Sequence, residues 1–162
     1  MLNPSSPLAA LMNATVRPGT VEWIGVRPQR RTPIAVVHRA MLDPHVGLVG
    51  DRYGGGSGAR HVTLIQHESL IAIASYLGLE QVLPEQLRRN IVVSGINLLA
   101  LKDKRFRLGQ ALLEMTGECH PCSRMEETFG VGGYNAVRGH GGITARVLEG
   151  GEVSVGDKLG VI

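Results

Sequence analysis

The sequence is poor in aromatic residues and has neither a long apolar run nor a block of basic residues. Aromatic residues make up 4% of the 162 residues, which argues against a nucleic-acid surface that stacks bases on aromatic rings. No apolar run approaches the roughly 18–20 residues that a membrane-spanning helix needs. The apolar N-terminal segment also lacks the basic residues of a secretory signal peptide. We therefore expect neither a membrane nor a nucleic acid among the partners.

Cysteine is also scarce, since Cys119 and Cys122 are the only two. Two cysteines without an export signal suit a reducing compartment better than a disulfide framework, so we expect a cytoplasmic protein. The length suits one domain with its own core. The formal net charge of +3, carried mostly by arginine, serves either solubility or an anion site, because guanidinium groups match the geometry of phosphate and carboxylate.

Short segments rich in Val, Ile and Thr, separated by Gly and Pro, predict a series of strands. These segments are residues 20–26, 32–42, 60–66, 90–96, 105–117 and 143–162. The last segment predicts a hairpin that turns at residues 149–152. Helices are predicted at residues 67–79, 83–90 and 121–130, the first with Leu70, Ile71, Ala74 and Leu77 on its inward face. Because so few helices separate the strands, we expect a mainly β fold, a closed or nearly closed β-barrel with a few short peripheral helices, rather than a doubly wound parallel sheet.

Two glycine-dense loops, at residues 47–61 and 130–142, either lie free on the surface or bring backbone N–H groups close to a ligand. The first loop has neither the G-K-[ST] ending of a P-loop nor a G-x-G-x-x-G that opens a helix. It keeps a set of N–H donors flanked by Arg52 and Arg60, which suits an anion.

Two further segments combine arginine with polar residues next to predicted strands: "LRRNI" at residues 87–91 and "RGHGGITARV" at residues 138–147. Each is either an ordinary surface cluster or one side of a phosphate site. A shared anionic ligand is the simplest hypothesis that accounts for these segments together with the first glycine loop.

The segment "GECHPCSRMEE", at residues 117–127, holds both cysteines as C-x-x-C. A thioredoxin-type dithiol needs a βαβ context that the pattern does not supply. A zinc site needs a partner pair, and the six histidines are scattered without H-x₃₋₅-H spacing. Both cysteines lie in a polar, turn-like segment, which favours exposed and reactive thiols over two buried apolar side chains.

Four segments, in this order, resemble the MOSC domain, the module named after the C-terminal part of molybdenum-cofactor sulfurases. They are "GLVGDRY…RHVTLIQHE", "LRRNIVVSGINLLAL", "LGQALLEMTGECHPCSRME" and "HGGITARVLEGGEVSVGDKL". The resemblance runs from about residue 20 to the C-terminus, so it predicts an N-terminal extension at 1–19 and a MOSC domain at 20–162. It implies a mostly β barrel with a few peripheral helices.

The resemblance implies that Cys122, in its Pro-Cys context, is the functional residue. This cysteine would carry sulfur as a persulfide or ligate the molybdenum of the pterin cofactor, and both roles suit a soft thiolate. The residues that match the family's cofactor-binding segments by position are Asp51, Arg52, Arg60, His61, Arg89, Asn90, Arg138 and His140. Cys119 matches no family requirement.

The resemblance leaves two functions open. One is an enzyme that uses the molybdenum cofactor to reduce N-hydroxylated compounds, and the second is a non-enzymatic carrier of cofactor or sulfur. The C-x-x-C spacing by itself adds a third alternative, a dithiol oxidoreductase. Because the chain has no room for a pyridoxal-phosphate desulfurase or a ferredoxin domain, we expect a separate protein to donate sulfur or electrons.

Overall fold

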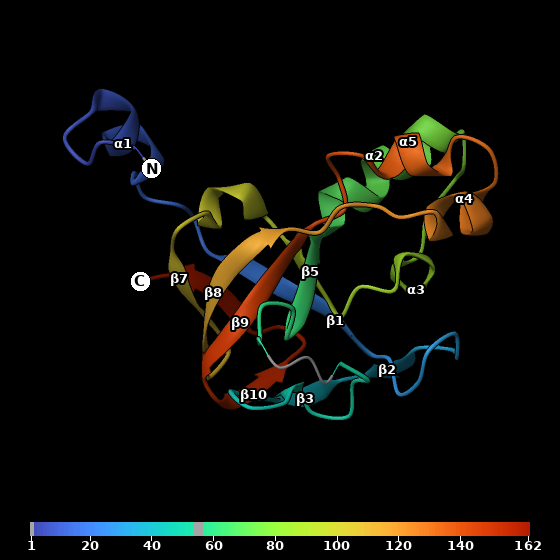
Figure 1. Cartoon of the computed structure of the whole chain (residues 1–162), viewed down its shortest axis with the longest axis horizontal. Coiled ribbons are helices and arrows are strands. Elements are labelled where there is room, and N and C mark those ends of the chain that lie inside the picture. The colour runs from blue at the N-terminus through green and yellow to red at the C-terminus, as the bar shows by residue number, and fades with distance from the viewer. Residues whose placement is uncertain (1, 54–56) are drawn as a thin grey trace.

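Seven strands of the computed structural model, which describes residues 2–53 and 57–162, close into a barrel (Figure 1). The strands follow one another in the order β11–β7–β8–β9–β5–β6–β1, and the pairing of β1 with β11 completes the ring. Their bounds are β1 (Gly19–Val26), β5 (Val62–Gln66), β6 (Ile91–Ser94), β7 (Arg105–Leu108), β8 (Ala111–Glu118), β9 (Ile143–Glu149) and β11 (Lys158–Val161). Strands β5 and β6 are parallel, and the other neighbours in the ring are antiparallel. The predicted mainly β barrel is confirmed.

A second, three-stranded sheet flanks the barrel in the order β10 (Gly151–Ser154), β3 (Arg39–Asp43), β4 (Gly47–Leu48). The segment predicted as one strand at 32–42 is split between β2 (Ala35–Val37), which pairs with β1, and β3 in the second sheet.

The predicted hairpin at residues 149–152 is wrong. Strand β9 pairs with β8 and β5, whereas β10 pairs with β3. The chain leaves the barrel here because Gly151 packs against the turn between β7 and β8, where a Cβ atom would stand 2.6 Å from the backbone of Gln110. The amide of Gln110 donates to the carbonyl of Glu152 and holds the crossing in place.

The helices are short and lie outside the barrel. They are α1 (Pro7–Met12), α2 (His67–Leu77), α3 (Pro84–Leu87), α4 (Arg124–Phe129) and α5 (Gly133–Val137), with a 3₁₀ turn η1 (Leu98–Leu101). Helix α5 lies in a segment predicted as loop, and α3 is shorter than predicted because Arg88 adopts a left-handed conformation. Helix α2 ends at Gly78 as predicted, but its buried face includes Ile73, while Ile71 is 60% exposed. No helix among residues 2–53 and 57–162 is long and apolar enough to cross a membrane.

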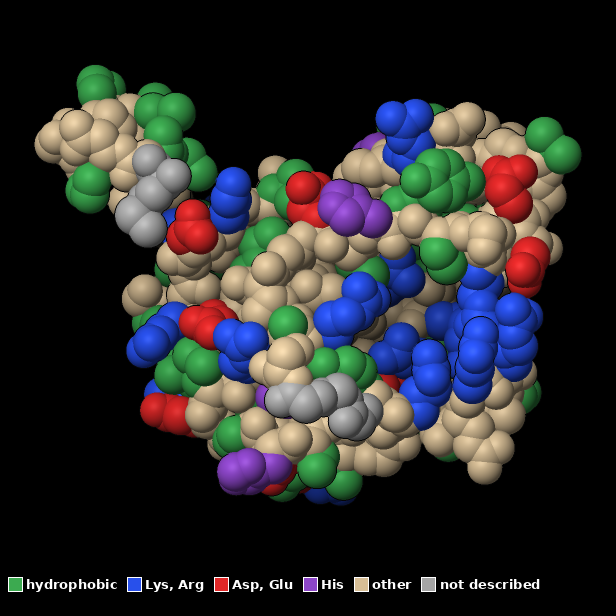
Figure 2. All heavy atoms as spheres, viewed as in Figure 1, with side chains coloured by type: hydrophobic (Ala, Val, Ile, Leu, Met, Phe, Trp, Pro, Cys, Tyr) green, Lys and Arg blue, Asp and Glu red, His purple; other side chains and the backbone are tan. Residues whose placement is uncertain are grey.

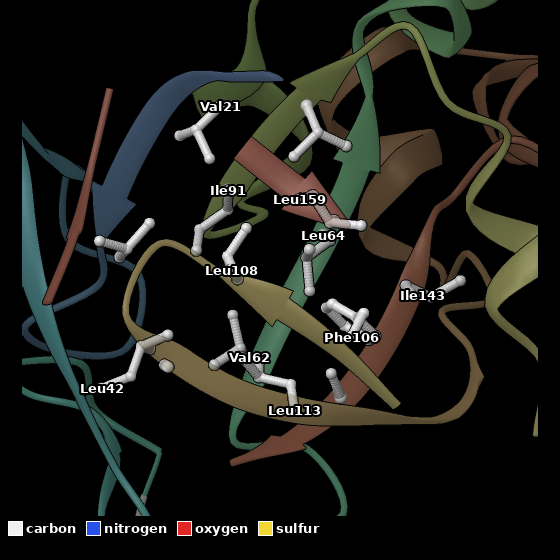
Figure 3. Packing of buried hydrophobic residues seen from close by; sticks show 14 of the residues in the cluster. Val21, Leu42, Val62, Leu64, Ile91, Phe106, Leu108, Leu113, Ile143 and Leu159 are labelled. Carbon is white, nitrogen blue, oxygen red and sulfur yellow. The ribbon is translucent and has the colours of Figure 1, made fainter. Parts of the chain in front are cut away.

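Two apolar clusters hold these elements together. One fills the barrel with residues such as Leu64, Ile91 and Phe106 (Figure 3). The other packs the outer face of β5 and β6 against α2 to α5 through residues such as Ile65 and Val92. Successive strand residues point to opposite faces, so neighbouring positions along β5 and β6 serve the two clusters in turn. The second cluster fixes α4 against the barrel and thereby positions the cysteine segment that precedes it.

The N-terminal segment lies apart from the barrel core. Helix α1 stands at one end of the molecule (Figure 1), and the first barrel strand begins at Gly19. The division into an extension at 1–19 and a domain at 20–162 stays a prediction. Residues 54–56 of the glycine-dense loop predicted at 47–61 lie outside the described residues.

Candidate functional site

An open pocket of about 450 Å³ lies between the loop that follows β1, the end of α3 and the start of α4. Its arginines are Arg27, Arg30, Arg31, Arg52, Arg60, Arg88, Arg89 and Arg124, and Cys119, His120, Cys122, Ser123 and Glu127 complete its polar lining. We call it the arginine pocket. Figure 2 shows the gathering of basic side chains on this side of the molecule, at the right of the view. The volume suits a small-molecule ligand.

Most of these arginines lack a carboxylate partner. Arg27 pairs with Asp51 at 2.8 Å, and Arg31 makes an exposed contact of 3.4 Å with Glu127. Among residues 2–53 and 57–162, no carboxylate oxygen lies within ion-pair distance of Arg30, Arg52, Arg60, Arg88, Arg89 or Arg124. A concave surface with this excess of positive charge attracts a ligand that carries more than one negative charge.

Arg89 is the buried arginine of the pocket, with 9% of its surface exposed. Its Nε donates to the carbonyl of Gly141 at 2.7 Å and its Nη1 to that of Leu87 at 2.8 Å. Burial lowers the pKa of Arg89, and the neighbouring charges of Arg27 and Arg60 lower it further. Because a guanidinium stays protonated at neutral pH, a buried cation held by neutral carbonyls is an incomplete electrostatic arrangement that a bound anion would complete.

Behind the pocket, Asp51 and Asn90 form a buried support for Arg27. The Asp51 carboxylate accepts from the backbone N of Arg27 at 2.7 Å, from its Nη2 at 2.8 Å and from Nδ2 of Asn90 at 3.0 Å. Asn90 also binds Gly25 and Thr63 through its side chain. Burial raises the pKa of Asp51, but the hydrogen bonds and charge of Arg27 outweigh burial and hold that pKa below its usual value. The pair orients Arg27 and does not line the pocket.

The two cysteines differ in environment. Cys122 is exposed, in the segment between β8 and α4, and Cys119 is 3% exposed. The Cys119 amide donates to the carbonyl of Gly142 at 2.8 Å, and its Sγ lies 3.9 Å from Nη2 of Arg60. Cys122 therefore presents a soft thiol donor at the pocket, while Cys119 forms part of the pocket wall.

Gly141 and Gly142 allow the loop after α5 to wedge between the cysteine segment and β5. A Cβ atom on Gly141 would stand 2.0 Å from the carbonyl oxygen of Cys119, and one on Gly142 would stand 1.9 Å from that of Leu64. Gly142 also has a φ of +88°, a backbone conformation that residues with a side chain rarely adopt. These glycines serve close backbone packing, and through Gly141 they also anchor Arg89.

Five of the eight residues predicted to bind the cofactor lie outside the arginine pocket: Asp51 and Asn90, which support Arg27, and His61, Arg138 and His140. His61 is buried and its Nδ1 accepts from the backbone N of Val147 at 3.1 Å. Burial lowers the pKa of His61, which keeps it a neutral acceptor. Arg138 contacts Asn135 at the end of α5. His140 lines a separate cavity of about 50 Å³ on the other side of Cys119. Cys122, Arg52, Arg60 and Arg89, by contrast, do come together.

The sequence-based set omitted Arg27, Arg30, Arg31, Arg88 and Arg124, all of which line the pocket. One signal was available in "VRPQRRT", where three arginines fall within five residues just after a predicted strand. The zinc hypothesis finds no support, since the part of the chain that the structure describes has no cluster of three or more His, Cys, Asp or Glu suited to a metal ion.

The site lies within a region that a family model recognises. The model of the MOSC domain matches residues 49–160, well over half of the chain. The chain belongs to the MOSC family. The match covers the barrel from β5 onward and the cysteine segment, whereas β1 and the arginines of residues 27–31 precede it. Comparison with curated protein sequences gave no match.

Solved structures show the same MOSC fold. YuaD from Bacillus subtilis superposes with a TM-score of 0.79 at 22% identity, over 90% of this chain and 96% of that one. YiiM from Geobacillus stearothermophilus gives 0.73 at 16% identity, over 89% and 75% of the two chains. YiiM from Escherichia coli gives 0.68 at 19% identity, over 88% and 69%. At these identities the likeness establishes the fold.

Proposed function

We propose that this MOSC protein binds the molybdenum cofactor in the arginine pocket, with Cys122 as the protein ligand of the metal. One observation carries the proposal. The exposed thiol of Cys122 lines the same pocket as the buried Arg89, and no carboxylate among the described residues pairs with Arg89. Family membership adds support, because the MOSC family is associated with this cofactor.

The residues present fit such a ligand. A thiolate is a soft donor of the kind that such a metal centre accepts. Phosphate and oxo groups need charge-assisted hydrogen-bond donors. Arg52 and Arg60 supply them from the glycine-dense loop, and Arg89 supplies them from the segment before β6. Arg27, held by Asp51, is oriented before any ligand arrives. Such preorganisation lowers the entropy that binding must spend on ordering side chains.

The cofactor, when bound, would supply a two-electron redox centre, and the reaction we propose for it is the reduction of N-hydroxylated compounds. The balanced change is R–NHOH + 2e⁻ + 2H⁺ → R–NH₂ + H₂O, so a separate protein must donate the electrons. In this reaction the arginines hold the anionic groups of the ligand. Cys122, whose side chain is exposed and lines the pocket, would hold the redox centre.

The first test measures bound cofactor. The chain is purified from a host that makes the cofactor, and molybdenum and pterin are quantified for the wild type, Cys122→Ser and Cys119→Ser. We expect near-equimolar metal in the wild type and in Cys119→Ser and a loss of molybdenum in Cys122→Ser, because an alcohol is a hard, weak ligand. Equal molybdenum in Cys122→Ser and wild type would refute the ligation.

A second measurement separates an enzyme from a carrier. The exposure of Cys122 also suits a protein that hands cofactor or sulfur to another. Loaded protein is therefore mixed with a hydroxylamine-type substrate and a chemically reduced dye as the electron donor. Formation of the amine identifies a reductase. Retention of metal without amine formation identifies a carrier.

A further inference from the structure

Cys119 is a buried thiol that neither the apolar core nor the proposed cofactor site uses. It belongs to neither of the two apolar clusters, although it is 3% exposed. Its sulfur faces the arginine pocket and contacts Arg60 Nη2 at 3.9 Å. A cysteine that only fills space is surrounded by apolar side chains, and this one faces a guanidinium and the pocket that also holds Cys122.

The two sulfurs share one environment. Both cysteines line the arginine pocket, together with Arg60 and Arg89. In a fully extended chain, Cα atoms three residues apart are separated by about 10 Å, and a disulfide needs them within roughly 7 Å. The spacing of the two cysteines therefore lets a bend over residues 119–122 bring their Cα atoms into the range that a disulfide needs.

The backbone is anchored at both cysteines. Cys119 is anchored through its amide to Gly142 and is packed against Gly141. Residues 119–122 form neither helix nor strand, and α4 begins at Arg124. The carbonyl of Cys122 accepts from the amide of Met125 at 3.0 Å, so residues 120 and 121 lie between two backbone anchors and a bend has to come from them.

We propose that Cys119 is a resolving thiol for Cys122, and that peroxide converts the pair into a reversible Cys119–Cys122 disulfide. In the first step Cys122–SH + H₂O₂ gives Cys122–SOH + H₂O, as the O–O bond breaks and the sulfur loses two electrons. In the second step the Cys119 sulfur attacks the sulfenic sulfur: Cys122–SOH + Cys119–SH gives the disulfide and H₂O. Two thiols of an external reductant restore both cysteines.

The disulfide would serve the proposed cofactor site in two ways, and this consequence rests on the proposed role of Cys122. It would withdraw Cys122 from the metal, and it would prevent the exposed sulfur from advancing to the sulfinic acid, which thiols cannot reduce. The bond itself needs no cofactor, so the inference is testable on the apoprotein.

The experiment treats cofactor-free full-length protein with hydrogen peroxide and follows intact mass and free thiols. We expect the wild type to lose two hydrogens and both thiols without forming dimers, and dithiothreitol to restore them. Cys119→Ser and Cys119→Ala should instead gain two oxygens at Cys122, and the reductant should not reverse this change. In Cys122→Ser the buried Cys119 should stay reduced. A wild type that gains oxygen at Cys122 as the Cys119 variants do, or that forms disulfide-linked dimers, would overturn the proposal.

Repeating the oxidation on cofactor-loaded protein separates this inference from the proposed function. If Cys122 ligates the metal, the loaded protein forms the disulfide more slowly than the apoprotein. Equal rates with and without cofactor would refute the ligation and leave the resolving role of Cys119 standing. Failure of the apoprotein to form the bond would refute only the resolving role.

Discussion

Replacing Asp51 with Asn tests whether the buried Asp51–Arg27 ion pair behind the pocket stabilises the fold in addition to orienting Arg27. The Asp51 side chain is 1% exposed, and that of Arg27 is 16% exposed. The carboxylate receives the backbone N, Nε and Nη2 of Arg27 together with Nδ2 of Asn90. An amide at position 51 removes the charge and sets an NH₂ group against these donors.

The expected loss follows from the burial of the pair. Removing one partner of a buried ion pair costs about 3–5 kcal/mol, because the other charge stays buried without compensation. Arg27 keeps some contact with the open pocket, so we expect the lower end, about 3 kcal/mol. For a chain of this size each kcal/mol shifts Tm by about 2–4 °C, which gives a fall of roughly 6–12 °C.

Urea and thermal unfolding of wild type and Asp51→Asn at pH 7 measure this loss. Glu149→Gln, which breaks the exposed pair with Arg107, is the matched control and should cost no more than about 0.5 kcal/mol. The folded-state pKa of Asp51 lies below 3.8. Its stabilisation is therefore complete above the unfolded pKa and is lost as the pH falls through the folded value, so the two proteins should converge in acid. A difference below about 1 kcal/mol at pH 7 would refute the reasoning.

Two further substitutions test the parts of the fold that surround the pocket. Burial lowers the folded-state pKa of His61 below 6.5, so the stabilisation from neutral His61 is complete above pH 6.5 and is lost as the pH falls. His61→Asn keeps an acceptor for the amide of Val147 and should therefore flatten the decline of the urea midpoint between pH 7 and pH 5. Equal slopes for the two proteins would contradict this. The methyl group of Gly142→Ala would collide with the carbonyl of Leu64, so this variant should lower the free energy of unfolding by more than about 3 kcal/mol. Gly139 has a similar φ but open space around it, so Gly139→Ala should cost only about 1–2 kcal/mol in the same assay.

The barrel was predictable because its signals are local. Short β-rich segments broken by glycine mark β1, β5 and β6, and the scarcity of helices points to closure. The pairing of β10 with β3 was not predictable, since it joins segments more than a hundred residues apart. Nothing in the residues around Gly150 distinguishes a hairpin from a crossing to another sheet, and the contacts of Gly151 with a distant turn decide between them.

The site was predictable in part for a similar reason. Arg60 and His61 are neighbours in the sequence and were both expected to bind the ligand, yet the structure puts only Arg60 in the pocket. Arg60 lies in a turn and His61 in the bend that leads into β5, so their neighbouring positions in the sequence do not give their side chains a common direction. The arginines at 27–31 reach the pocket from a different part of the chain, and only the folded structure brings them there.

Arg27 and Arg89 show how one pocket treats two arginines differently. The chain neutralises Arg27 with its own carboxylate, Asp51, and so makes it part of the wall. It holds Arg89, which is at least as buried, through the neutral carbonyls of Leu87 and Gly141. A carboxylate placed beside Arg89 would remove the electrostatic cost of its burial and would also repel an anion from the pocket floor. The absence of such a group among the described residues is therefore what the proposed anion site requires, and under that proposal it separates Arg89, as a binding arginine, from Arg27, as a supporting one.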